Sequence, residues 1–344
     1  MKIMTGIDLH GNNAVLGLMD MEGRKILHKR VPCELPKVLD VLEPYREQID
    51  TIAVESTFNW YWLVDGLQEN HYKVVLANPA KIDQYDGLKH LDDKSEAYFL
   101  AKLLCLEILP TGYIYNKKTR PVRDILRRRM SLVRHRTSLL LSFKGLYTRN
   151  TGKTLSLSKV KSIEVEEAKK LFTHSADQLI AEEQVGLIKQ FDQTIGRIEE
   201  AVLKVVNGLP NYQRLQTIPG IGKILGLTIT LETGEIQRFA SAGDYASYCR
   251  CVKSQRLSNE KQKGRNNAKC GNKYLGWAFI EGANFARRFN PECQQFMDRK
   301  KSKTNGVVAI KAMACKLSKA AWHMMAKDID FDLEKVFPNM KTKK

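Results

Sequence analysis

Short apolar runs separated by turn-forming residues occupy the start of the chain. Residues 2–8 read as a strand that ends on Asp8. Residues 14–20 and 25–31 read as two further strands, and residues 21–24 between them are typical of a hairpin turn. Three such segments in succession predict a meander of antiparallel strands.

The pattern then alternates between helices and strands. Residues 35–48 and 60–70 read as helices, whereas 51–55 and 73–77 are short apolar runs that predict buried strands. A further helix is predicted over residues 93–108. A meander followed by alternating strands and helices is the element order of an RNase H-like α/β fold, although other α/β domains share pieces of it.

Residues 117–153 combine apolar residues at helical spacing with twelve Lys or Arg and a single acid, Asp124. This pattern predicts a long basic amphipathic helix. Such a face can simply be solvated, but the near-absence of acids favours contact with nucleic-acid phosphates. The predicted contacts on this helix are Arg127, Arg128 and Arg134.

Residues 176–207 carry an apolar seam with steps of three and four residues, the spacing of a heptad repeat. The seam consists of Ile188, Phe191, Ile195, Ile198, Val202 and Val205. It can pair two protomers or pack a helix onto its own domain, and the sequence leaves both interpretations open.

The final region begins with a Pro-Gly turn, residues 218–222, followed by an apolar run. It is similar to the hairpin of helix-hairpin-helix modules, in which glycines let backbone N–H groups approach a phosphate at a helix N-terminus. On this interpretation Gly220, Gly222 and Lys223 contact nucleic acid. A turn between two helices needs no DNA, so a purely structural turn remains an alternative.

Residues 250–273 are polar, basic and rich in Asn and Gly, which suits a loop or hairpin held against a polyanion. The predicted contacts are Lys253, Arg256, Lys263 and Arg265. Ser254 and Ser258 lie in the same segment, but their spacing alone does not identify a nucleophile.

Composition strengthens the nucleic-acid interpretation. The 344 residues include 56 Lys or Arg against 38 Asp or Glu, a formal net charge of +18, and such an excess favours a polyanionic partner. No apolar stretch is long enough to span a bilayer, and the N-terminus has no signal-peptide pattern. The seven scattered cysteines lack a zinc-site spacing, so reduced thiols in a cytoplasmic protein are expected.

Four acids are candidates for a metal site. Asp8 and Glu55 end two predicted strands that are neighbours in an RNase H-like sheet, and Asp93 and Glu96 lie three apart at the start of a predicted helix. Each alone has an ordinary structural explanation, such as a favourable place near a helix N-terminus. Together they predict a cluster that needs cations, and two Mg²⁺ ions would clamp a phosphodiester there.

Several segments together resemble the DEDD transposases of the insertion sequence 110/1111 family, which is related to the Piv DNA invertases. They are GIDLHG (6–11), AVESTFNWYWL (53–63), ANPAKI (77–82), DDKSEAYFLAKLL (92–104), TIPGIGKILGLTI (217–229) and RFASAGDYASYCRCVKSQRLS (238–258). The resemblance runs in order over nearly the whole chain. It implies a RuvC-like (RNase H fold) domain over 1–115, a basic helix and coiled-coil segment over 116–208, a mainly helical transposase domain over 209–330 and a basic tail over 331–344.

The resemblance also implies site residues. The family's acidic tetrad falls on Asp8, Glu55, Asp93 and Glu96; the last acid is normally Asp in the family, and Asp92 is one residue out of register with Asp93. The family's serine nucleophile falls on Ser258, with Ser254 as the alternative. The implied cofactor is Mg²⁺ bound as a pair, with Mn²⁺ as a substitute.

The implied activity is Mg²⁺-dependent cutting and rejoining of insertion-sequence DNA through a serine–DNA ester. The implied partners are element and target DNA, a noncoding guide RNA from the element, and further copies of the chain, in a bacterial cytoplasm beside the nucleoid. Three alternatives remain: a site-specific DNA invertase, a Holliday-junction nuclease that uses the acids alone, and a non-catalytic nucleic-acid-binding protein.

Overall fold

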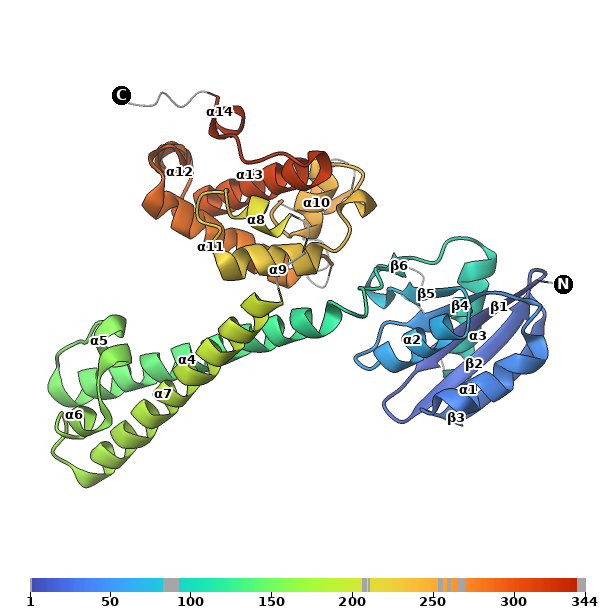
Figure 1. Ribbon diagram of the computed structural model, residues 1–344, viewed down its shortest axis with the longest axis horizontal. Coiled ribbons are helices and arrows are strands. Elements are labelled where there is room, and N and C mark those ends of the chain that lie inside the picture. The colour runs from blue at the N-terminus through green and yellow to red at the C-terminus, as the bar shows by residue number, and fades with distance from the viewer. Residues whose placement is uncertain are drawn as a thin grey trace. The chain divides into compact units, whose positions relative to one another are not determined.

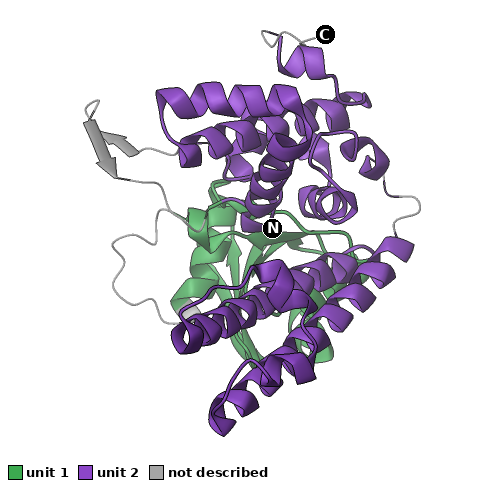
Figure 2. Cartoon of the chain, turned by 90° about the vertical axis from the view of Figure 1, so that its left-hand side faces the viewer, with its two compact units in different colours: residues 1–117, 255–270 green, residues 118–254, 271–344 purple. Residues whose placement is uncertain are grey.

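A computed structural model describes residues 2–82, 93–205, 209, 211–252, 256–258, 261–264 and 270–338. Of residues 93–94, 256–258 and 261–264 it describes the backbone alone. The chain divides into two compact units, residues 1–117 with 255–270 (unit 1) and residues 118–254 with 271–344 (unit 2) (Figure 2). The chain therefore passes between the units three times, after residues 117, 254 and 270.

Unit 1 is built on a mixed sheet, as the sequence predicts. In the described part of this unit the strands of the sheet are β1 (Ile3–Leu9), β2 (Asn13–Asp20), β3 (Lys25–Pro32), β4 (Ile49–Glu55), β5 (Val74–Ala77) and β6 (Thr111–Gly112). Their order across the sheet is β3-β2-β1-β4-β5-β6 (Figure 1). The first three strands form the expected antiparallel meander, β4 and β5 run parallel to β1, and β6 is antiparallel to β5.

The two faces of this sheet are covered by different helices. Side chains alternate between faces along a strand. Ile3, Ile7 and Leu9 of β1 belong to one apolar core with residues of α1 (Leu35–Leu42) and α2 (Tyr61–Glu69). The opposite face packs against α3 (Asp93–Cys105) through two smaller apolar clusters.

Two glycines let α3 approach the sheet closely. A Cβ at Gly6 in β1 would lie 2.0 Å from the carbonyl oxygen of Ala97, and one at Gly17 in β2 would lie 2.9 Å from the backbone nitrogen of Tyr98. Neither distance is possible for real atoms, so both positions need glycine. The consequence is that the first turns of α3 are held against β1 and β2.

Unit 2 begins with two long helices, α4 (Arg120–Thr151) and α7 (Ser175–Lys204), which run side by side (Figure 1). The short helices α5 (Leu157–Ser162) and α6 (Val165–Lys169) join them at the end where α4 stops at Gly152. Ile188 and Val202 of the predicted heptad seam are buried against apolar residues of α4. The seam therefore packs a helix within its own chain.

The rest of unit 2 is a bundle of helices. They are α8 (Tyr212–Leu215), α9 (Lys223–Thr233), α10 (Ala242–Tyr248), α11 (Lys273–Phe289), α12 (Pro291–Lys303), α13 (Gly306–Lys327) and α14 (Leu333–Val336). Leu275 and Phe279 of α11 and Met313 and Leu317 of α13 lie fully buried at its centre. Among the described helices, none is both long and apolar enough to cross a lipid bilayer.

Candidate active site

Asp8 and Glu55 occupy equivalent ends of two neighbouring parallel strands. The register between β1 and β4 pairs Ile7 with Val54, and the next residue on each strand is an acid. Because Ile7 and Val54 belong to the core on the α1–α2 face, alternation directs Asp8 and Glu55 to the face that α3 covers. The Asp8 residue is almost wholly buried, with 1% of its surface exposed.

Glu96 reaches the same place from α3. It lies one residue before Ala97, whose carbonyl oxygen sits over Gly6, two residues before Asp8 on β1. The close packing allowed by Gly6 and Gly17 therefore brings the first turn of α3 to the strand ends that carry the acids. Three of the four predicted acids thus converge on one face of the sheet.

The protonation of Glu55 reflects this convergence. Burial, the hydrogen bond with Asp8 and the negative charges of Asp8 and Glu96 together raise the pKa of Glu55 to about 8. Carboxylates that share a site in this way cannot all stay ionised without a cation. At neutral pH the protein alone therefore keeps Glu55 protonated.

His10 also faces this site and was missed by the sequence reasoning. It follows Asp8 by two residues, so both side chains point to the same face of the extended chain. The His10 Nε2 atom is 3.1 Å from Asp8 Oδ2. That oxygen is buried and accepts no hydrogen bond of good geometry from any described residue. The histidine in the segment GIDLHG was the available signal, because an alternating Asp-x-His pair places both side chains together.

Asp93 is the first residue of α3, but its side chain lies outside the described residues, as does all of Asp92. Among the side chains that are described, no three His, Cys, Asp or Glu are arranged to hold a metal ion. The described acids nonetheless offer the hard oxygen donors that Mg²⁺ prefers. The buried Asp8 Oδ2, which lacks a described hydrogen-bond donor, and the raised pKa of Glu55 are compatible with cation binding among these acids.

Ser258 lies in a two-stranded hairpin of β7 (Arg256–Ser258) and β8 (Lys261–Gly264). The backbone of Ser258 pairs with that of Lys261 at the turn end of the hairpin. Only the backbone of Arg256 and Lys263 is described. The predicted residues Lys253, Ser254 and Arg265 lie outside the described residues.

Several arginines of α4 are bound to acids from elsewhere in the chain. Arg129 pairs with Glu199 and Arg136 pairs with Asp192, both on α7. Arg127 binds Glu232 of α9. Acids on other helices therefore neutralise part of the positive charge of residues 117–153. Of the predicted nucleic-acid contacts on α4, Arg128 and Arg134 are exposed.

The glycines of the 218–222 turn have different structural roles. Gly220 has a φ of +82°, and a Cβ there would lie 2.2 Å from the carbonyl oxygen of Gly282 on α11, so this glycine is needed for packing. Gly222 caps α9 with open space around it, and both Gly222 and Lys223 are exposed. The first N–H groups of α9 are thus open to a phosphate.

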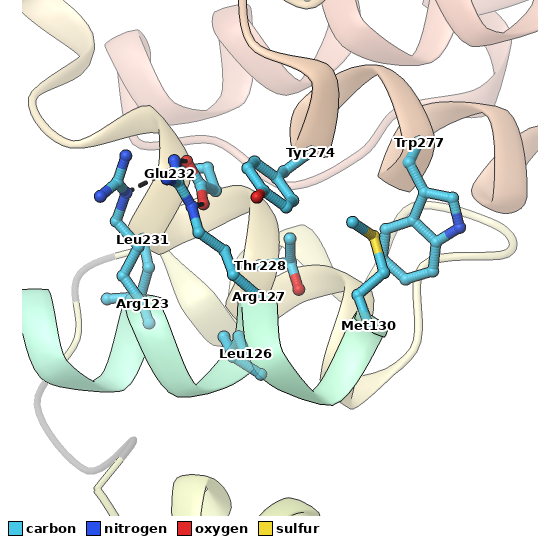
Figure 3. A pocket seen from close by; sticks show the side chains of 9 residues that line it. All are labelled: Arg123, Leu126, Arg127, Met130, Thr228, Leu231, Glu232, Tyr274 and Trp277. Atoms are coloured by element: carbon cyan, nitrogen blue, oxygen red, sulfur yellow. Dashed lines mark hydrogen bonds and ion pairs between the residues drawn. The ribbon is translucent and has the colours of Figure 1, made fainter. Parts of the chain in front are cut away.

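A second buried carboxylate, Glu232 on α9, was also missed. Arg127 donates to it from Nε at 2.5 Å and from a terminal nitrogen at 2.8 Å, and Arg123 donates from Nε at 3.1 Å (Figure 3). The Asn272 amide donates to it at 2.7 Å, and the Arg127 guanidinium lies 4.1 Å from the ring centre of Tyr274. We call these residues the Glu232 network: Arg123, Arg127, Glu232, Asn272 and Tyr274.

The Glu232 network sets the charge of its acid. Burial alone would raise the pKa of Glu232, but the hydrogen bond from Arg127 and the charges of Arg123 and Arg127 hold the pKa below its usual range. No local pattern could have predicted this network, because Glu232 is more than 100 residues from both arginines.

Comparison with known proteins gives matches over both units. A family model for DEDD transposases of the IS110 type, described as transposase, matches residues 5–149. A second model, described as transposase IS116/IS110/IS902 family, matches residues 212–298. The chain is also 27% identical over 176 residues to the transposase for insertion sequence element IS1111A of Coxiella burnetii (strain RSA 493 / Nine Mile phase I). That match covers 47% of this chain and 45% of the relative, less than half the relative's length.

Proposed function

The chain belongs to the DEDD transposases of the IS110 family, and from that premise we propose that it cuts and rejoins the DNA of an insertion sequence. The observation that carries the proposal is the convergence of Asp8, Glu55 and Glu96 on one face of the sheet. The strand order β3-β2-β1-β4-β5 supports an RNase H-like domain beneath these acids. The division into 1–115, 116–208, 209–330 and a basic tail is part of the same proposal.

Asp8, Glu55 and Glu96, with Asp93 at the start of α3, would hold Mg²⁺, or Mn²⁺ in its place. When bound, a pair of such ions activates an attacking oxygen and stabilises the charge that develops on the phosphate. The carboxylates supply the negative charge that positions the ions. His10 Nε2 lies 3.1 Å from Asp8 Oδ2, so its imidazole would adjoin the carboxylate that holds the metal. Glu96 is one methylene longer than the family's usual Asp. It reaches the site from α3, whereas Asp8 and Glu55 lie on strands.

Ser258 supplies the nucleophile in the proposed reaction. Its Oγ forms a bond to the DNA phosphorus, its proton passes to a base, and one ester oxygen of the DNA leaves as a hydroxyl. Rejoining reverses the step, because a DNA hydroxyl attacks the serine ester and returns the proton to Ser258. One phosphate ester replaces another at each stage, so the cycle needs no energy source.

The basic surfaces would hold the nucleic acids. The exposed residues Arg128 and Arg134 of α4 and the open N-terminus of α9 at Gly222 and Lys223 support contact with phosphates. An element-encoded guide RNA and a homo-oligomer that joins acids and serine from different copies complete the proposal. Both come from the family, and the net charge of +18 supports an RNA as well as a DNA partner.

The metal site is tested with Asp8→Asn in the full chain. The variant should lose strand cleavage by at least about 100-fold, since even residues that only support metal ligands contribute 10–100-fold. DNA binding in a gel-shift assay should stay within about twofold, because the basic surfaces are untouched. Asp50→Asn is the matched control: it lies at the other end of β4 and pairs with Lys2. Full cleavage by Asp8→Asn would contradict the metal-site proposal.

The serine is tested by trapping the covalent intermediate on denaturing gels. Ser258→Ala should give no protein–DNA adduct, whereas Ser254→Ala should give the wild-type amount. The reverse result would move the nucleophile to Ser254. An adduct from the double variant would remove serine chemistry from the proposal.

A further inference from the structure

Two of the three places where the chain passes between the units, after residues 117 and 270, lie next to residues of the Glu232 network in sequence. The first passage follows residue 117, and α4 carries Arg123 and Arg127 in its first two turns. The third passage follows residue 270, and Asn272 is the second residue of unit 2 after it. The second passage follows residue 254, three residues beyond Cys251, which lies buried in the bundle.

The two ends of the segment that carries Ser258 are fastened to each other inside unit 2. The backbone N–H of Asn272 donates to the carbonyl of Tyr248 at 2.6 Å, and the Arg250 guanidinium donates to the carbonyl of Gly271 at 3.2 Å. Gly271 has a φ of +78°, and a Cβ there would lie 2.7 Å from the Tyr248 carbonyl oxygen. We call residues 248–251 and 271–272 the stem.

Asn272 connects this stem to the rest of the Glu232 network. Its Oδ1 accepts from the N–H groups of Tyr274 and Leu275 and so caps α11, while its Nδ2 donates to Glu232. Glu232 in turn binds both arginines of α4. A single buried carboxylate therefore joins the stem, α9 and the start of α4.

We propose that Glu232 and Asn272 are positioning residues, which fix the stem of the Ser258 segment to the helix that enters unit 2 from unit 1. The inference rests on the proposed function, because it gives the stem a purpose only if Ser258 is the nucleophile. Buried ion pairs add little net stability over apolar packing. They can restrict the relative position of the elements that carry them, because a buried charged donor is costly without its acceptor. A stem held in this way limits the positions from which Ser258 can reach a phosphate, which favours the reactive arrangement.

The variant Asn272→Ser separates positioning from folding. Serine keeps an oxygen to cap α11 and loses the amide that donates to Glu232, while both arginines still neutralise the acid. The matched control is Asn290→Ser, which alters another helix-capping Asn in unit 2, on α12, whose described bond is to the N–H of Cys293. Both proteins are assayed as full chains with a DNA duplex that carries the element ends and the RNA transcribed from the element.

At saturating DNA, Asn272→Ser should form the serine–DNA adduct about tenfold more slowly, with its Kd for DNA unchanged. Amide hydrogen exchange should speed up in the stem and stay unchanged in α7. Asn290→Ser should match the wild type in rate and in stem exchange. A purely structural role would lower the melting temperature of Asn272→Ser without changing the adduct rate of folded protein, and that result would overturn the proposal.

A charge exchange provides the rescue. Glu232→Gln alone should slow adduct formation more than Asn272→Ser, because it also removes the buried carboxylate that Arg123 and Arg127 bind. Combining it with Asn272→Asp restores one carboxylate and one amide in the network, and Asp still caps α11. The double variant should recover at least half of the wild-type rate, and no recovery in a folded double variant would overturn the proposal. If the wild type forms no adduct, the proposed function fails, while stem exchange still tests the positioning.

Discussion

Unit 1 and unit 2 each bury a glutamate carboxylate, and the neighbouring charges shift the two pKa values in opposite directions. Glu55 lies beside Asp8 and Glu96, and burial with these like charges raises its pKa to about 8. Glu232 lies beside Arg123 and Arg127, which hold its pKa below the usual range despite burial. Both are glutamates that follow apolar runs, and only their surroundings differ.

The contrast separates an acid whose charge is stabilised by two arginines from an acid whose ionisation is disfavoured by its neighbours. In unit 2 the chain supplies its own cations, so the charge is balanced when folding is complete. In unit 1 burial and the negative charges of Asp8 and Glu96 disfavour ionisation of Glu55, and a cation bound from solution would offset that cost. Perturbed carboxylates of the second kind mark functional sites more reliably than paired ones.

The largest expected effect is on the paired acid. Glu232→Ala should lower the free energy of unfolding by about 3–5 kcal/mol, since it leaves two arginines without their buried partner. Glu199→Ala removes the half-exposed partner of Arg129 on α7 and should cost about 1 kcal/mol or less. Urea denaturation of both variants measures the difference. Equal losses would mean that burial does not distinguish the two ion pairs.

The clustered acids of unit 1 should respond to metal. Mg²⁺ at 100 times its Kd should raise the free energy of unfolding by about 2.7 kcal/mol, because it binds the folded chain alone. Chelation with EDTA should reverse the gain, and Asp8→Asn should abolish most of it. Glu232→Gln should keep the full Mg²⁺ response. Thermal denaturation with and without Mg²⁺ provides the measurement, and a response in the Asp8→Asn variant equal to wild type would place the metal elsewhere.

Replacing each acid by glutamine should change the free energy of unfolding in opposite directions. Without divalent cations at pH 7, Glu55→Gln should raise the free energy of unfolding by about 1–2 kcal/mol, because it removes a group that the fold keeps from ionising. Glu232→Gln should lower it. Destabilisation by Glu55→Gln would show that its carboxylate is already balanced by a group of the protein.

The pH dependence follows from the two shifts. Glu55 binds its proton more tightly in the folded state, so its contribution makes the wild type lose stability as pH rises from about 4.5 to about 8, and Glu55→Gln should flatten this slope. Glu232 has the opposite effect. Its contribution to the free energy of unfolding is present above about pH 4.5 and is lost as pH falls through its lowered pKa in the folded state. Denaturation series across pH 3–9 compare both variants with the wild type.

The smallest expected effect is on neighbouring arginines of α4. Arg128→Ala should reduce the slope of log Kd against log salt concentration by about 0.9, the effect of one lost phosphate contact. Arg127→Ala should mainly lower stability, because Arg127 is bound to Glu232. An equal change of slope in the two variants would mean that Arg127 also contacts the backbone of the nucleic acid.

The local features of the chain were predictable from sequence. Alternation and strand ends are sufficient to place Asp8 and Glu55 at the ends of neighbouring strands, because both depend on short segments. The helix predicted over residues 35–48 is shorter, since α1 ends at Leu42 and a 3-10 turn follows around Pro44, which lacks an N–H to continue the helix.

Features that depend on distant partners were not predictable. The basic stretch 117–153 shows a lack of local acids, but Glu199 and Glu232 balance part of its charge from other helices. The heptad spacing of α7 fits a partner helix equally well within the chain or on another copy, and the fold uses α4. Gly220 reads as a phosphate contact in sequence, while packing against Gly282 already requires it.

Gly6 carries a consequence for how the chain can vary. No side chain fits at this position, because even a methyl group would overlap the carbonyl oxygen of Ala97. Substitutions at Gly6 should therefore be rejected in a deep mutational scan as strongly as those at Asp8, although glycine has no group to offer a substrate. Substitutions that the chain tolerates should therefore lie away from this contact between β1 and α3.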